Sequence, residues 1–237
     1  MEKSNEEQNS NQKTLVERRD FLGGAATLAG TSLLGLAVPA STAAATASDR
    51  APDRMPPIPV DKMTDAQKKA AEEITSGPRK EVVGPFIPLL RSPEFMSRLQ
   101  KAGAYLRYET KLGPGISEFI ILITARQWTQ QFEWDSHQDL AKKAGIAPEI
   151  VAAIGEGRRP TGMTPDQEMV HDFCTELRLT QCVSDPSYAR VLKRFGEQGV
   201  IDITGLAGYY SMLGMIMNVA RTPIPGATTL PLEYFPH

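Results

Sequence analysis

The sequence predicts an all-α protein, a single-domain helical bundle of about seven to eight helices. Apolar residues recur at helical spacing through most of the chain after residue 63, and capping and stop signals separate the segments. No strand pattern of convincing length, no repeat of fixed period and no glycine-rich phosphate loop occurs. These observations support the all-α class.

Residues 1–47 have the layout of an export signal. Arg18 and Arg19 precede an apolar run from Phe21 to Val38, and the small residues at 45–47 offer a cleavage site of the A-x-A type. The paired arginines predict the twin-arginine route, and therefore a periplasmic or extracellular location. An uncleaved membrane anchor is the alternative, although the glycines in the run weaken it as a span.

The remaining chain is long enough for one domain with a sizeable core. Residues 48–62 are proline-rich and predict a linker or arm, residues 63–222 the helical domain, and residues 223–237 a proline-rich tail that wraps a neighbour or lines a pocket mouth. The formal charge is −2, with acids and bases interleaved. No basic stripe follows a phosphate backbone, so we expect neither a nucleic acid partner nor, once the signal is removed, a membrane partner.

Helices are expected in order over residues 64–77, 92–111, 116–143, 147–157, 164–180, 185–199 and 200–220. Thr64 and Thr164 are cap residues at the starts of two of them, and Asp185-Pro186 begins a third. Gly77-Pro78 stops the first, and a loop with apolar contacts separates it from the second.

The segment 116–143 predicts the central, buried helix. Ile116, Phe119, Ile120 and Ile123 recur at helical spacing, and their neighbours widen the apolar face almost all the way round. A strand is the alternative for so short an apolar run. No turn signal interrupts the chain to Lys143, however, and that length favours a helix.

The last segment, 200–220, is apolar enough to resemble a membrane span. Asp202, Thr204 and Asn218 argue against that interpretation. Its methionines, among them Met212 and Met215, suit a helix that lies at the centre of the fold or at a subunit contact.

The stretch "QQFEWDSH" pairs Glu133 with His137 at i and i+4, one turn after Gln130. On a helix these side chains share a face, and a carboxylate that orients an imidazole suits acid/base chemistry near neutral pH. A solvated surface pair is the alternative. Glu118 lies upstream in the apolar "ISEFIIL", where it either serves as a first-turn acid or meets a partner such as His137 or Arg126.

Three segments resemble the carboxymuconolactone decarboxylase family, which shares an all-helical fold with alkylhydroperoxidase D. They are "SPEFMSRLQKAGAYLRYET", "ISEFIILITARQWTQQFEWDSHQDLAKKAGI" and "FGEQGVIDITGLAGYYSMLGMIMNVA", and the resemblance covers about Val60 to Pro225. The peroxidase branch has a glutamate, a C-x-x-C pair and a histidine four residues later. Here Glu118 and His137 are kept, while Gln130 and Glu133 stand where the cysteines would be.

The resemblance implies a lyase of the decarboxylase branch, without dithiol peroxidase chemistry and without a cofactor. It implies proton transfer on a small lactone or carboxylate, by decarboxylation or isomerisation, in a homo-oligomer (dimer, trimer or hexamer). His137 is the expected acid, Glu133 orients it, and Glu118 is its partner or a second proton carrier. The expected substrate-binding residues are Arg126, which could hold a carboxylate, Gln130 and Trp134.

Three other hypotheses remain open. A non-catalytic oligomer would bind a hydrophobic ligand through Trp128, Trp134 and Tyr108. Glu118, Glu133 and His137 could instead be metal ligands, although no metal is expected. A residual peroxidase activity would need other thiols than those of the family pattern.

The two cysteines, Cys174 and Cys182, belong to no C-x-x-C motif, which excludes the usual zinc and dithiol spacings. We expect two buried small hydrophobic residues, with a disulfide between them as the alternative. His171 is expected to be structural, and His237 is the terminal residue.

Overall fold

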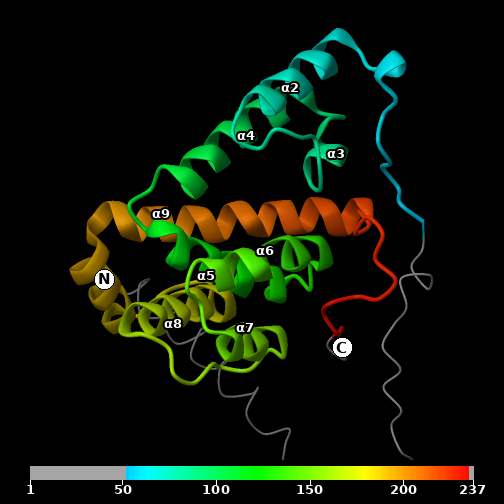
Figure 1. Ribbon diagram of the computed structural model, residues 1–237. Coiled ribbons are helices and arrows are strands. Elements are labelled where there is room, and N and C mark those ends of the chain that lie inside the picture. Colours follow the sequence, from blue (N-terminus) through cyan, green and yellow to red (C-terminus); the bar gives the residue numbers. More distant parts are fainter. Residues whose placement is uncertain (1–51, 235–237) are drawn as a thin grey trace, which may run out of the picture. The chain divides into compact units, whose positions relative to one another are not determined.

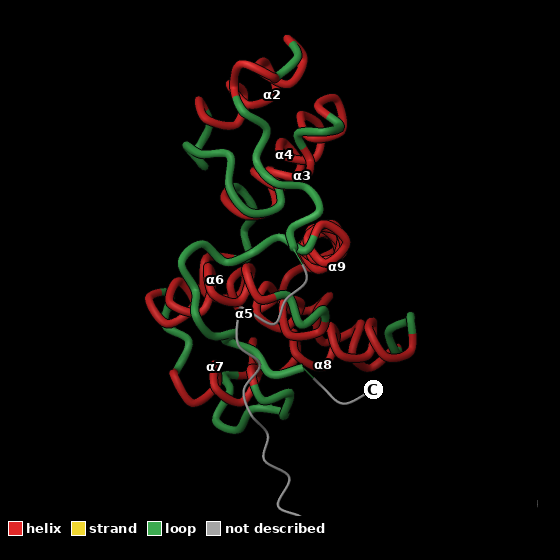
Figure 2. The backbone as a smooth tube through the Cα atoms, turned by 90° about the vertical axis from the view of Figure 1, so that its right-hand side faces the viewer, coloured by secondary structure: helices red, strands yellow, loops and turns green. Residues whose placement is uncertain are grey.

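Helix α9 (Asp185–Ala220) lies at the centre of the part of the chain that the computed structural model describes, residues 52–234. Figures 1 and 2 show it between two groups of helices. One group contains α2 (Asp65–Ser76), α3 (Phe86–Leu89) and α4 (Pro93–Tyr108). The other contains α5 (Gly113–Gln127), α6 (Gln131–Lys143), α7 (Pro148–Gly155) and α8 (Pro165–Thr180).

The secondary structure confirms the predicted fold class. Eight α-helices and the short 3₁₀ helix η2 (Val60–Lys62) account for the regular structure of residues 52–234, and this range contains no strand (Figure 2). The predicted signal at 1–47 and the terminal His237 lie outside the described residues.

Local sequence signals set several helix boundaries as expected. Thr64 and Thr164 each form a capping box, in which the side chain accepts from the backbone N–H three residues on and the glutamine there returns a hydrogen bond. Helix α4 begins with Pro93, whose missing N–H is tolerated in a first turn.

Helix α5 is the buried helix that the sequence predicts. Its residues Phe119 to Leu122 are fully inaccessible to solvent, and the helix packs against α6, α7, α8 and α9. Burial of each such large apolar side chain contributes about 1.5–3 kcal/mol. This helix therefore fixes the positions of the elements around it.

The expectation of one uninterrupted helix from 116 to 143 is wrong. Thr129 adopts a left-handed backbone conformation (φ 44°), and Gln130 is extended and caps α6 by accepting a hydrogen bond from the backbone N–H of Glu133. The chain therefore folds back as an αα-hairpin, in which α5 and α6 pack against each other. No glycine or proline marks this turn in the sequence. The apolar pattern therefore predicts a continuous helix across it.

The last two predicted helices form the two parts of α9, one on each side of a kink. The chain departs from helical geometry at Gly196 (φ 71°, ψ 177°), three residues before the expected break at Gly199. By length and composition α9 could cross a membrane, but half of its most apolar window is buried among the other helices. Asp202 is buried in it and accepts a hydrogen bond from the Tyr105 hydroxyl (3.3 Å), as a core helix of a bundle allows.

The proline-rich tail packs on its own chain. The Gln131 side chain accepts from the backbone N–H of Leu232 (2.9 Å) and donates to its carbonyl (2.8 Å), and the Leu232 side chain is buried in the core. Arg126 donates to the carbonyl of Glu233 (2.7 Å). These contacts hold the tail against α5 and α6.

Candidate functional site

The hairpin of α5 and α6 brings Glu118 to His137. On one continuous helix, 19 residues would separate them by about 28 Å at 1.5 Å per residue. In the folded chain Glu118 Oε2 lies 2.5 Å from His137 Nδ1. The turn at Thr129 is therefore the feature that creates the site.

His137 is held by a carboxylate at each ring nitrogen. Glu118 contacts Nδ1, and Glu133 Oε2, one helical turn away, lies 3.4 Å from Nε2. The Tyr210 hydroxyl of α9 lies at 3.4 Å from the same Nε2, with its ring edge-on to the imidazole. The Nδ1 contact is short and fixes the ring, while the two Nε2 contacts are long.

Burial and hydrogen bonding shift the pKa values of His137 and Tyr210. His137, Glu118, Glu133 and Tyr210 are each at most 7% exposed. Burial disfavours a charged imidazole, but hydrogen bonds to Glu118 and Glu133 outweigh it, and the pKa of His137 is raised. Burial also raises the pKa of Tyr210 well above its ordinary value, so this phenol stays protonated near neutral pH.

A cavity of about 290 Å³ opens beside the Nε2 side of His137. Glu133, His137 and Tyr210 line it, whereas Glu118 lies behind the imidazole and does not. The wall is otherwise largely apolar and includes Phe86, Tyr108, Phe132, Leu140 and Leu213. A proton at Nε2 thus faces a partly open cavity that is sized for a small molecule.

Two arginines complete this cavity. Arg107 of α4 lies 3.5 Å from Glu118 Oε1. Arg79, in the loop after α2, donates to the carbonyl of Gln100 (3.2 Å) and to the Tyr209 hydroxyl (3.4 Å), and its guanidinium lies over the Phe86 ring. These contacts hold Arg79 in place before any ligand binds.

Sequence reasoning missed Arg79, Arg107 and Tyr210. Arg107 and Tyr210 are polar residues at inward positions of otherwise amphipathic or apolar helices, which is the signal that could have indicated them. Arg79 follows Gly77-Pro78 in a loop, and no sequence pattern ties it to the site.

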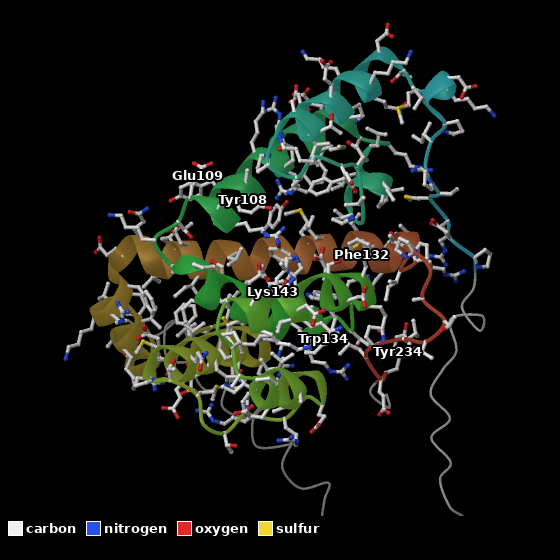
Figure 3. All side chains as sticks on the ribbon, in the orientation of Figure 1. Tyr108, Glu109, Phe132, Trp134, Lys143 and Tyr234 are labelled. Carbon is white, nitrogen blue, oxygen red and sulfur yellow. The ribbon has the colours of Figure 1, made fainter. Side chains whose placement is uncertain are left out.

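The three residues expected to bind substrate do not line this cavity. Arg126 and Trp134 line a separate cavity of about 610 Å³ that the tail residues Glu233 and Tyr234 help to form. Figure 3 labels Trp134 and Tyr234 of that cavity, and also Tyr108 and Phe132, which line the cavity of His137.

The third expected residue, Gln130, is buried at the start of α6. There it caps the helix and donates to Asn218 Oδ1 (3.3 Å). Its place in the turn separates it from the helix face that Glu133 and His137 share.

No thiol lines the cavity of His137. Cys174 is buried in α8, where desolvation raises the pKa of its thiol to about 12. Cys182 lies on the surface beyond α8, so the expectation that both cysteines are buried is wrong for this one. The two cysteines are free rather than paired.

The geometry does not favour the metal hypothesis. Glu118 and Glu133 contact opposite nitrogens of His137, so the three side chains cannot converge on one ion with the imidazole as a ligand. Within residues 52–234, no group of three or more His, Cys, Asp or Glu side chains is placed to hold a metal.

Comparison with known proteins gives one structural match. No protein-family model and no curated protein matches the sequence. A crystal structure described as an alkylhydroperoxidase AhpD core, an uncharacterized peroxidase-related protein from Ralstonia eutropha JMP134, is similar with a TM-score of 0.59 and 14% sequence identity. The match covers 73% of this chain and 93% of that one.

The chain has an alkylhydroperoxidase D-like fold. At this identity the likeness supports the architecture alone. Membership of the carboxymuconolactone decarboxylase family therefore stays a prediction, which no family model bears out. Within the alkylhydroperoxidase D-like fold of this chain, the acid and histidine lie on the α5–α6 hairpin without a cysteine beside them.

Proposed function

We propose that this protein is an acid/base enzyme that transfers a proton to or from carbon in a small carboxylate or lactone. The observation that carries the proposal is the buried His137, with Glu118 at Nδ1 and with Nε2 toward the cavity. The pKa of His137 is raised by its hydrogen bonds to the two glutamates, which favours the protonated imidazole that a general acid requires.

The charges around the cavity favour an anionic substrate. Arg79 and Arg107 contribute two positive charges and the protonated His137 a third, against the two carboxylates of Glu118 and Glu133. A substrate carboxylate would balance the excess, and a guanidinium is well suited to bind it through two hydrogen bonds. Arg79 and Arg107 thus replace Arg126 as the proposed carboxylate-binding residues.

The geometry also exchanges the roles first expected for the two glutamates. Glu118 lies behind the ring and positions it, much as a buried acid holds a catalytic histidine in one tautomer. Glu133 lines the cavity and is placed to accept or return a proton at the substrate. It is the proposed second proton carrier.

For a decarboxylation, the carbon–carbon bond to the carboxylate breaks and CO2 leaves. The electron pair is delocalised into a conjugated carbonyl of the substrate, and His137 Nε2 gives its proton to the carbon. For an isomerisation, Glu133 would remove one proton and His137 deliver another. The protonated Tyr210 could donate a hydrogen bond to the developing enolate oxygen.

Two competing activities have less support. Dithiol peroxide reduction needs a thiolate nucleophile, and neither cysteine lines the cavity. The binding of a hydrophobic ligand through Trp128, Trp134 and Tyr108 would need these aromatics together, yet only Tyr108 lines the cavity of His137.

The test is a screen of small lactones and carboxylated aromatics in D2O with the purified chain. NMR follows deuterium entering the product at carbon, and released CO2 is measured in parallel. His137→Gln should lower turnover by about 10²–10⁴-fold, the usual contribution of a positioned acid. Asp139→Asn, on the exposed face of the same helix, is the matched control and should keep full activity.

Unchanged turnover in His137→Gln would refute the proposal. Arg79→Met should raise KM for carboxylated substrates more than it lowers kcat, because it removes a binding charge rather than a proton carrier. A loss in kcat alone would contradict that role.

We further propose that the chain is exported and forms a homo-oligomer. The Arg18-Arg19 signal pattern supports export. Exposed apolar residues on α9, among them Ile201, Met215 and Val219, support a subunit contact. Mass spectrometry of the secreted chain tests export, and an uncleaved intracellular chain would overturn it. Analytical ultracentrifugation tests the homo-oligomer, and a monomer would overturn that proposal.

A further inference from the structure

A third cavity, a polar hollow, lies between the end of α5, the loop after α7, and α8, and shares Arg126 with the cavity of about 610 Å³. Its volume is about 270 Å³, and it shares no lining residue with the cavity of His137. Arg126 comes from the last turn of α5, and Arg158 and Arg159 follow Gly157 in the loop. His171 and Arg178 lie on one face of α8, two turns apart.

The hollow carries an excess of positive charge. Four arginines line it, and none of the described residues in its wall is acidic. Three carboxylates lie near these arginines. Glu156 pairs with Arg158 in an exposed pair (2.6 Å), Asp172 pairs with Arg159, and the charge of Glu233 acts on Arg126.

None of these carboxylates forms an ion pair with Arg178. Asp172 also pairs with Arg190 (3.0 Å), so one carboxylate is shared between two guanidinium groups. Among residues 52–234, no acid forms an ion pair with Arg178.

His171 adds a neutral donor to this wall. Its Nδ1 lies 3.1 Å from Arg159 Nη1. A guanidinium only donates hydrogen bonds, so Nδ1 must accept and the ring proton resides on Nε2. Burial and the charge of Arg159 lower the pKa of His171, in agreement with a neutral ring.

We propose that this hollow is a binding site for a small oxyanion with two or more negative charges, a phosphate group or a polycarboxylate. The chemistry common to both ligands is a pair of negatively charged oxygens on one atom, which a guanidinium group binds through two hydrogen bonds. Arg158, Arg159 and Arg178 supply these groups from two elements, and the loop and α8 are joined through Asp172. The site is independent of the acid/base chemistry at His137.

The three histidines of the chain provide a direct test. Ring signals of His171 are followed by NMR while inorganic phosphate, and separately a tricarboxylate, is added at constant pH and ionic strength in a non-phosphate buffer. Saturable movement of the His171 signal with either anion is expected. The tighter of the two identifies which oxyanion the site prefers.

The variant Arg158→Ala/Arg178→Ala removes two charges from the wall. Both side chains belong to surface residues, so the fold should be kept. Affinity should fall at least about tenfold, since each lost charged contact is strong. Arg98→Ala/Lys101→Ala on α4 removes the same charge from an exposed surface and should leave affinity within about twofold, as expected for screened surface charges.

Three results would overturn the proposal: no saturable binding of either anion, equal affinity in the two double variants, or movement of the His137 signal alone. The last would assign the anion to the other cavity. Arg178→Gln, which changes a single exposed residue, repeats the test should the double variant be unstable.

Discussion

The contact between Glu118 and His137 makes a prediction about stability that does not depend on knowing the substrate. Glu118→Gln keeps the shape of the side chain but removes its charge. The wild-type contact is 2.5 Å long, and both partners are at most 7% exposed. A hydrogen bond to a charged group contributes about 1.5–3 kcal/mol to stability. Because the Glu118–His137 contact is buried, we expect Glu118→Gln to lose a free energy of unfolding in that range rather than the smaller value of a surface pair.

The loss of folding stability in Glu118→Gln should depend on pH, and the pKa of His137 sets the direction of this dependence. The pKa of His137 is raised in the folded chain, so its contribution to stability is fully present below the ordinary histidine value of 6.5. It is lost as the pH rises through the raised value of the folded state. The difference in the free energy of unfolding between wild type and Glu118→Gln is therefore largest near pH 6 and becomes smaller at higher pH. A remainder persists because Glu118 also contacts Arg107 (3.5 Å), whose charge does not titrate in this range.

Urea denaturation of both chains at about pH 6 and about pH 9 measures this difference. The control is Glu94→Gln, which removes an exposed i,i+4 pair with Arg98 and should change stability little at either pH. A stability loss that is equal at the two pH values would refute a charged contact at Nδ1. A loss of stability in Glu118→Gln no larger than that in Glu94→Gln would refute the burial of the Glu118–His137 contact.

Two further predictions concern packing and thiol chemistry. In Gly103→Ala the new methyl group would overlap the Tyr209 ring and should destabilise the chain by about 1–3 kcal/mol, whereas Gly208→Ala meets nothing within 4 Å and should stabilise it by about 0.4–1 kcal/mol. Chemical denaturation checks the pair, and equal effects would contradict the packing of α4 on α9. With a thiol reagent, the folded chain should react rapidly at Cys182 and only after unfolding at Cys174, which is buried with a pKa of about 12. Rapid reaction of two thiols in the folded chain would show that α8 is not packed as described.

Local signals in the sequence were sufficient to predict most of the helices. The capping threonines, Thr64 and Thr164, and the apolar run of α5 predict helices that the structure confirms, because a cap or a buried face acts over only a few residues. The break after α5 was not predictable in this way. Thr129 takes a left-handed conformation that is unusual for this residue. The turn is closed by backbone hydrogen bonds from Thr129 to Arg126 and from Gln130 to Ala125, which residues of any type can form.

For the candidate site too, the sequence predicts only the features that depend on residues close along the chain. The spacing of Glu133 and His137 placed them on one helix face, since i and i+4 positions are neighbours on any helix. The sequence also excluded the dithiol pair at this site, because neither Gln130 nor Glu133 carries sulfur.

The sequence by itself determined the helical class, the i,i+4 pair and the absence of cysteines at that position, because each depends on residues that are close along the chain. Only the tertiary structure decided that Glu118 holds Nδ1, that Tyr210 and two arginines share the cavity, and that Arg126 and Trp134 line another. These contacts join the loop after α2 with α4, α5, α6 and α9, and the direction in which each helix packs sets them. That direction follows from burial summed over the whole core, which no single stretch of the sequence encodes.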